Sequence, residues 1–259
     1  MRVNHVKELL KRGEPTFGAW LNIPNASSAR IMARQGFDWL LIDMEHSAHS
    51  PAIMADMVAT IADAGTSAPF VRIPYNSVEW YKWALDAGAW GVLTPMVNTR
   101  EEAIRAVTCA KYPPLGMRSI GGAFAPYGFG TTDRNAYLQA ANDEIMVIVQ
   151  IESATSMQNL EDILSVPGID VAFVGPNDLH ASLGLLPTLY STQPVFLDAL
   201  ERIKAISKKY YLATGIMSSD GPASAERVRD GFQMVTVTTD ISSMVAGATQ
   251  NLRRARTEL

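Results

Sequence analysis

The stretch that decides the fold is Gly36-Phe37-Asp38-Trp39-Leu40-Leu41-Ile42-Asp43-Met44-Glu45-His46. It begins with a glycine, which is typical of the end of a helix. An unbroken apolar run follows, as expected of a strand that is buried on both faces in a parallel sheet. Polar residues then come where the strand ends, and this is where parallel α/β folds carry functional side chains.

The same unit recurs along the chain. Eight strands are predicted, at Phe17–Ile23, Trp39–Met44, Phe70–Ile73, Gly91–Pro95, Ile145–Ile151, Val171–Gly175, Ala213–Met217 and Met234–Thr238. Helical patterns fit between them, at Ser27–Gln35, Ser50–Ala64, Val78–Ala87, Thr99–Lys111, Ser156–Leu164, Pro194–Lys209, Ala223–Asp230 and Ile241–Leu259. Eight β-then-α units with short links predict one domain over residues 1–259, an α/β fold of the (β/α)8 TIM-barrel type.

The main rival is an open, doubly wound sheet. Such a sheet usually has a glycine-rich phosphate turn after its first strand, and no G-x-G-x-x-G motif follows Phe17–Ile23. The one long irregular stretch is Tyr112–Thr132, and a loop of that length in a compact domain is usually functional.

Composition excludes several classes of protein. The net charge of −4 leaves no basic face for a nucleic-acid backbone, and the apolar runs have the length of strands, too short to span a membrane. The single cysteine, Cys109, permits no internal disulfide and is expected to lie buried in a helix. We therefore expect a cytoplasmic protein that acts on small molecules.

Polar residues follow four of the predicted strands: Asp43, Glu45 and His46; Arg72; Gln150 and Glu152; Asn177 and Asp178. Strands one, four and eight offer Asn22, Thr94 and Asp240. In a barrel the carboxyl ends of all strands meet at one rim, so these side chains are expected to converge there.

Glu152 and Asp178 form the most informative pair. Two carboxylates on neighbouring strand ends repel each other unless a cation lies between them. An oxygen-only site with room for water suits Mg²⁺ or Mn²⁺. The alternative is that each carboxylate caps the helix that follows it, and the spacing leaves both interpretations open.

Arg72 and His46 are the other candidates. Arg72 could hold a carboxylate or a developing enolate oxygen, or it could form a structural salt bridge with an acid at a neighbouring strand end. His46 could move a proton at neutral pH, oriented by Asp43 or Asp86, or it could be a buried histidine with satisfied hydrogen bonds. His46-x-x-His49 includes no cysteine and is a weak zinc signal.

The lysines bear on the mechanism. A Schiff-base aldolase needs a lysine inside the barrel, whereas all seven lysines of this chain fall on predicted helices or helix ends. This pattern favours a metal over an imine as the electron sink.

Several segments resemble the HpcH/HpaI aldolases, a family of metal-dependent class II pyruvate aldolases. The resemblance is carried, in the order of the family, by Gly36–Asp43 with Glu45-His46, Val71-Arg72, Tyr112-Pro113-Pro114 with Gly116 and Arg118, Val149-Gln150-Ile151-Glu152, and Val174-Gly175-Pro176 with Asp178-Leu179. It implies a carbon–carbon lyase that reversibly cleaves 4-hydroxy-2-oxo acids, such as 4-hydroxy-2-oxo-heptane-1,7-dioate, to pyruvate and an aldehyde through a metal-stabilised pyruvate enolate.

The resemblance also implies roles for residues. Glu152 and Asp178 hold a divalent metal, which is Mg²⁺, Mn²⁺ or Co²⁺. His46, made more basic by Asp86, acts through water as the acid–base group, and Arg72 stabilises the enolate. Substrate contacts are expected from Arg72, Gln150, Gly175, Pro176, Asn177, Asp178 and Met217. The resemblance further implies a homo-hexamer, a trimer of dimers that exchange the C-terminal helix, with Arg118–Thr132 contributing to a neighbouring site.

Other functions stay open. Oxaloacetate decarboxylation passes through the same enolate. Cleavage of acyl-CoA thioesters calls for a basic groove, which these strand ends do not offer. A non-catalytic binder of an acidic metabolite is disfavoured because both Glu152 and Asp178 are present. Met44, Asn177 to His180, and Met217 depart from the family pattern and leave the aldehyde open.

Overall fold

The computed structural model describes residues 1–258, and its centre is a closed barrel of eight parallel strands in sequence order. The strands are β1 (Thr16–Leu21), β2 (Trp39–Asp43), β3 (Ala68–Arg72), β4 (Gly91–Thr94), β5 (Met146–Ile151), β6 (Val171–Val174), β7 (Ala213–Ile216) and β8 (Met234–Thr239). Each pairs with the next in parallel, and β1 pairs with β8 to close the ring. The predicted (β/α)8 TIM barrel is confirmed.

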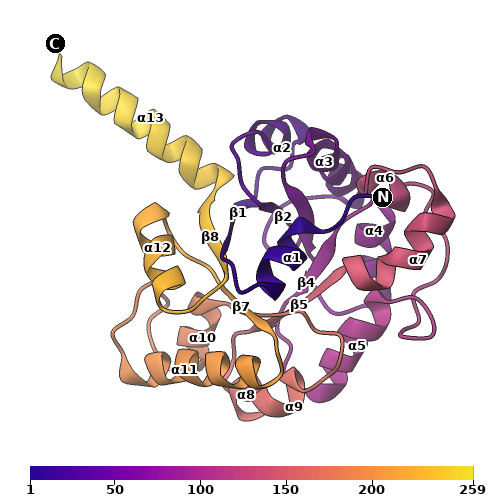
Figure 1. Ribbon diagram of the computed structural model, residues 1–259. Coiled ribbons are helices and arrows are strands. Elements are labelled where there is room, and N and C mark those ends of the chain that lie inside the picture. The colour runs from indigo at the N-terminus through magenta and orange to yellow at the C-terminus, as the bar shows by residue number, and fades with distance from the viewer. Residues whose placement is uncertain (259) are drawn as a thin grey trace.

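Helices surround the barrel (Figure 1). They are α1 (His5–Lys11), α2 (Ala26–Met32), α3 (Pro51–Ala64), α4 (Val78–Asp86), α5 (Arg100–Ala110), α6 (Ala125–Gly128), α7 (Arg134–Glu144), α8 (Ala154–Gln158), α9 (Leu160–Leu164), α10 (Pro176–Ser182), α11 (Pro194–Lys209), α12 (Gly221–Arg229) and α13 (Asp240–Thr257).

Burial explains why the strand pattern was so clear. Every residue of β2 to β7 is buried, because the barrel interior covers one face and the helices cover the other. Cys109 is buried in α5 as expected. Because the strands are parallel, the residues that follow them gather at one rim.

Several helices differ from the sequence prediction. The short helices α1, α6 and α10 were not predicted, nor was α7, in which only Tyr137 and Ala141 are buried and whose apolar stripe is therefore weak. The helix predicted at Ser156–Leu164 begins earlier, because the Ser153 side chain caps its first turn, and it is interrupted at Asn159 to give α8 and α9.

The stretch Tyr112–Thr132 is more ordered than a plain loop. It contains α6, and the Arg118 side chain within it is fully buried. Gly128 lies so close to the backbone of Gly88 that a Cβ there would overlap the Gly88 carbonyl. The stretch is thereby fixed against the end of α4.

The last helix, α13, projects away from the barrel (Figure 1). Its apolar side chains Ile241, Met244, Val245 and Leu252 are exposed. Its exchange between subunits stays a prediction, and Leu259, the predicted last residue of this helix, lies outside the described residues. Within residues 1–258, no helix has the length and apolar character needed to cross a membrane.

Candidate active site

A cavity of about 210 Å³ opens at the rim formed by the carboxyl ends of the strands. Its walls come from six different strand ends, so only the folded barrel brings them together. They are Trp20, Asn22, Asp43, His46, Arg72, Gln150, Phe173, Val174, Gly175, Pro176, Asn177, Asp178 and Met217. Every substrate-contact residue expected from the sequence therefore lines one cavity, and Glu152 lies directly beside it against Gly175.

Glu152, which follows β5, is 2% exposed and held at both oxygens. Oε1 accepts a hydrogen bond of 2.8 Å from the Met96 backbone N–H, and Oε2 accepts one from Gln150 Nε2. Burial raises the pKa of the Glu152 carboxyl to about 7, the Met96 N–H opposes this rise, and the nearby Asp178 and Glu45 carboxylates add to it.

Gly175 makes room for the Glu152 carboxylate next to the turn that carries Asp178. A Cβ at Gly175 would overlap Glu152 Oε2 and lie 2.7 Å from Gln150 Nε2. Gly175 leads directly into α10, whose first turn carries Pro176 and Asp178. Only glycine leaves space for the Glu152 carboxylate beside this turn.

The donor set fits a hard divalent cation. Among residues 1–258 no cluster of three or more His, Cys, Asp or Glu side chains is placed to bind a metal. The two carboxylates Glu152 and Asp178 are near enough for the charge of Asp178 to raise the pKa of Glu152. Mg²⁺ commonly binds through one or two carboxylates and keeps its other positions for water and substrate oxygens. The Gln150 Oε1 atom is buried without a hydrogen-bond partner in the described chain, which leaves a polar atom available to a ligand.

Arg72, the last residue of β3, is 6% exposed and held by acids. Nε and Nη2 donate to the two oxygens of Asp43 at 2.9 and 2.8 Å, and Nη1 lies 3.0 Å from Glu45 Oε2. The guanidinium also stacks on Trp20, 4.2 Å from the ring centroid. Burial opposes the ionised form of Asp43, but the hydrogen bonds and charge of Arg72 lower its pKa below the usual value.

His46 lines the same cavity from the loop after β2. Its side chain is 64% exposed, and Nε2 lies 3.8 Å from Glu45 Oε2. The alternative of a buried, satisfied histidine is therefore wrong, because the imidazole is open to solvent. Asp43, one of its two expected partners, instead accepts hydrogen bonds from Arg72 and from the backbone N–H of Glu45 and His46.

Comparison with known proteins decides the family. Residues 16–246 match the family model described as HpcH/HpaI aldolase/citrate lyase. The chain is 39% identical over 259 residues to the hydroxypyruvate/pyruvate aldolase of Paraburkholderia phytofirmans, covering 98% of each protein. This chain belongs to the HpcH/HpaI aldolase family.

Two further relatives agree. The chain is 38% identical to the 4-hydroxy-2-oxo-heptane-1,7-dioate aldolase of Salmonella paratyphi C, covering 95% of this chain and 92% of that protein. A crystal structure of an HpcH/HpaI aldolase/citrate lyase family protein from Burkholderia cenocepacia superposes with a TM-score of 0.89 at 36% identity, covering 98% and 99% of the two chains. As a member of this metal-dependent family of aldolases, the chain is a carbon–carbon lyase.

Asp86 was expected in the active site, but in the structure it lies away from the cavity. It ends α4, and its Oδ1 lies 3.0 Å from Arg118 Nη2. Arg118 in turn stacks on Tyr112 and donates to the Tyr137 hydroxyl at 3.0 Å. Within one described chain, Asp86 is thus paired with Arg118 and not with His46, because the stretch between α5 and α6 folds against the end of α4.

The position of Lys111 supports the expectation that no lysine forms an imine in the active site. Its ammonium is buried, and burial lowers its pKa to about 8, as in many imine-forming lysines. However, Nζ donates to the carbonyls of Asn142 and Ile145, and Ile145 precedes β5. Lys111 therefore lies at the amino ends of the strands, opposite the cavity.

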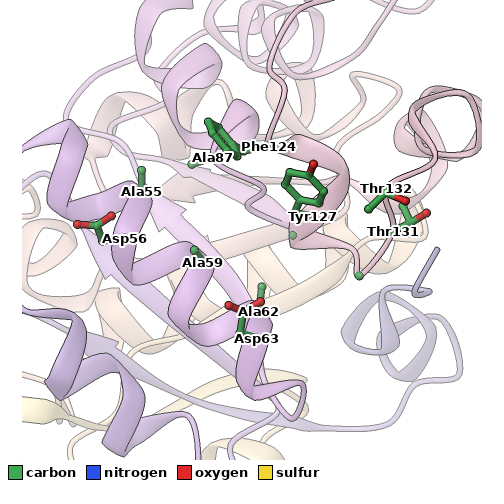
Figure 2. Close-up of a pocket in the computed structure, with 12 residues that line it drawn as sticks. Ala55, Asp56, Ala59, Ala62, Asp63, Ala87, Phe124, Tyr127, Thr131 and Thr132 are labelled. Carbon is green, nitrogen blue, oxygen red and sulfur yellow. The ribbon is translucent and has the colours of Figure 1, made fainter.

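A larger hollow, of about 840 Å³, lies away from the acids and the arginine of the rim cavity. It lies between α3 and the segment from Phe124 to Thr132 (Figure 2). Alanines such as Ala55 and Ala59 line it, together with the exposed rings of Phe124 and Tyr127. The smaller rim cavity contains the acids and the arginine, so side-chain chemistry and not volume identifies the active site.

Sequence reasoning missed two supports of the site, Trp20 and Met96. Trp20 stacks on Arg72, whereas the Asp43–Arg72 pair matches the salt bridge with a neighbouring strand-end acid that the sequence had left open. Met96 reaches Glu152 through its backbone with a φ of 50°, a left-handed conformation unusual for a methionine. The tryptophan two residues before the predicted rim residue Asn22 was a usable signal, whereas a backbone contact leaves none.

Proposed function

We propose that this chain is a class II pyruvate aldolase that cleaves 4-hydroxy-2-oxo acids to pyruvate, or hydroxypyruvate, and an aldehyde. The observation that carries the proposal is the cavity lined by Asp178 and Arg72, with the Glu152 carboxylate beside it against Gly175. Two carboxylates and one fixed guanidinium suit a 2-oxo acid whose carbonyl oxygen becomes an enolate.

Glu152 and Asp178 would hold the divalent cation, with Mg²⁺ or Mn²⁺ preferred and Co²⁺ as a further candidate. When bound, the cation supplies Lewis-acid polarisation of the keto group. Gln150 supports this arrangement by holding one Glu152 oxygen, and Gly175 does so by leaving the space that the carboxylate occupies. Gly175, Pro176, Asn177 and Met217 would form the walls around the 2-oxo acid.

Arg72 would bind the oxygen on which negative charge develops. Its five-donor guanidinium is already fixed by Asp43 and Glu45, so little reorganisation is needed when that charge appears. An arginine fixed in this way stabilises the enolate more than the substrate, and its loss should affect turnover more than binding.

His46 would move the proton at the reacting carbon or at the aldol hydroxyl, directly or through water. The His46 side chain is exposed in a single chain, which supports an active site that a second subunit completes. We propose that Asp86 orients His46 from a neighbouring subunit, because in its own chain Asp86 lies with Arg118 in the region expected to enter a neighbouring site. A hexamer, a trimer of dimers with exchanged α13, would bring them together.

Oxaloacetate decarboxylation is the second candidate. The same cavity would stabilise the same enolate, with carbon dioxide leaving in place of an aldehyde. The presence of His46 at the rim favours aldol cleavage, since decarboxylation needs no base to remove a hydroxyl proton.

The test is a retro-aldol screen. A panel of 4-hydroxy-2-oxo acids, including 4-hydroxy-2-oxo-heptane-1,7-dioate, is incubated with enzyme and Mg²⁺ or Mn²⁺, and release of the 2-oxo acid is followed with a coupled dehydrogenase. Oxaloacetate is run in parallel. We expect cleavage of at least one hydroxy-oxo acid at a higher kcat/KM than oxaloacetate; faster turnover of oxaloacetate would favour the second candidate.

A further inference from the structure

Asn22 is a polar residue of the cavity to which the mechanism above gives no role. It follows β1 directly, and its position is fixed because its backbone N–H donates to Asp240 Oδ1 at 2.9 Å. Its side chain lines the cavity beside Trp20 and Arg72. Asp240 itself is buried at the start of α13, so the anchor is part of the barrel frame.

The orientation of the Asn22 amide is determined by its neighbours. Nδ2 donates to Asp43 Oδ2 at 3.0 Å and to Ser47 Oγ at 3.0 Å. The ionised Asp43 carboxylate can only accept, so the NH2 group and not the oxygen must face it. Both amide hydrogens are thereby used, and among residues 1–258 Oδ1 receives no hydrogen bond, so this atom of Asn22 can accept one from a ligand.

The Asp43 carboxylate, in contrast, has no oxygen left to accept a further hydrogen bond. Its two oxygens already receive Nε and Nη2 of Arg72, the backbone N–H groups of Glu45 and His46, and the Asn22 amide. A hydroxyl group that enters this side of the cavity can therefore donate to Asn22 Oδ1 but not to Asp43.

Asn22 is also a direct neighbour of the group that binds the reacting oxygen. Asn22 Nδ2 and Arg72 Nη2 converge on the same Asp43 oxygen, at 3.0 and 2.8 Å. A ligand that places its reacting carbonyl oxygen against Arg72 would bring a hydroxyl on the adjacent carbon toward Asn22. An alkyl group in that place would leave Oδ1 without a donor, and this costs binding.

We infer that Asn22 is a specificity-determining residue that selects a reactant with a hydroxyl group next to its reacting carbonyl. The inference rests on the proposed function and names the substrate class for that site. The hydroxyl can belong to the 2-oxo acid, as in a 3-hydroxylated donor, or to the aldehyde, as in a 2-hydroxylated acceptor. The chemistry recognised is the same, and a grid of substrates separates the two.

The experiment measures aldol addition for four combinations, with pyruvate or hydroxypyruvate as donor and acetaldehyde or glycolaldehyde as acceptor. For each enzyme, two ratios of kcat/KM are taken, hydroxylated over plain donor and hydroxylated over plain acceptor. We expect Asn22→Ala to lower one of these ratios by about fivefold, the worth of one neutral hydrogen bond. The ratio that falls identifies the reactant that carries the hydroxyl.

The control variant is Ser47→Ala, which removes the other acceptor of Nδ2 but leaves Asp43 to orient the amide. We expect it to keep both ratios. Asn22→Leu, similar in size to asparagine, repeats the test without opening a hole, and thermal unfolding verifies that each variant is folded.

Two unchanged ratios in both Asn22 variants would overturn the inference, even if overall activity fell, because a residue that only positions Asp43 affects all four combinations alike. An equal loss of ratio in Ser47→Ala would overturn it too. A wild-type enzyme that turns over none of the four combinations would contradict the proposed function itself.

Discussion

Arg72 and Asp43 are joined side by side on neighbouring strands, with Nε 2.9 Å from Oδ1 and Nη2 2.8 Å from Oδ2. The two residues are register partners of β2 and β3, so the barrel itself sets this pairing. Both side chains are buried, and Asp43 is charged because Arg72 lowers its pKa. The guanidinium is thus oriented before any substrate binds.

Asp43→Asn tests this orientation. The amide cannot accept from both Arg72 nitrogens, so the guanidinium should shift from the place where charge develops. We expect kcat to fall about 100-fold, with a smaller change in the KM of the 2-oxo acid, because small misplacement of a positioned group costs rate. Steady-state kinetics measure both. Glu14→Gln, which breaks the exposed Arg12–Glu14 pair, is the control and should leave both constants unchanged.

An increase in KM with kcat unchanged would show that Asp43 contributes to substrate binding and adds no stabilisation that arises only in the transition state.

Gly175→Ala tests the space beside Glu152. The added Cβ would overlap Oε2 and force the carboxylate out of place. We expect Mg²⁺ or Mn²⁺ to bind about 10- to 100-fold more weakly, as measured by titration calorimetry. Gly221→Ala is the matched control, because a Cβ there has no atom of the described residues within 4 Å. Equal metal affinity in the two variants would contradict a role for Glu152 as ligand.

The acidity of Glu152 predicts how metal binding depends on pH. Burial raises its pKa to about 7, so a proton occupies the carboxylate below that pH and competes with the cation. We expect the apparent metal affinity to be constant above about pH 8 and to fall roughly tenfold per unit below about pH 6. Calorimetry across that range measures it, and affinity that is flat down to pH 5 would argue against Glu152.

The elements that sequence predicted best are the buried strands. Trp39 to Ile42 lie in β2 with no exposed residue, so one apolar run predicted both the strand and the rim residues that follow it. Arg72, Gln150 and Asp178 could be placed at one rim by the same logic, because a parallel barrel has only one end at which strands finish.

The partners of those residues could not be predicted. The sequence left open whether Arg72 meets substrate or a structural acid, and the register that pairs it with Asp43 depends on how two strands align. The pairing of Asp86 with Arg118 depends on the path of a long loop. The Met96 contact is made by the backbone, which has the same chemistry at every residue.

Lys111→Met tests a buried charge outside the active site. Burial lowers the pKa of Lys111 to about 8, whereas an unfolded lysine titrates near 10.4, so the unfolded state binds more protons between these values. Stability from this group therefore rises with pH across that window, by up to about 3 kcal/mol. We expect wild type to gain stability relative to the variant from pH 8 to 10.4 in urea unfolding. The exposed Lys208→Met should show no such trend.

Parallel pH profiles for wild type and Lys111→Met would mean that Lys111 has the same pKa in the folded and unfolded protein, so that burial does not lower it.

The claim on which the account depends is that Glu152 and Asp178 hold a cation beside which pyruvate becomes an enolate. The most direct measurement is exchange of the pyruvate methyl protons with deuterium in D₂O, followed by proton NMR without any aldehyde. We expect exchange with Mg²⁺ or Mn²⁺, its loss on chelation, recovery on adding metal back, and its loss in Glu152→Gln. Exchange at an unchanged rate after complete removal of metal would contradict the account.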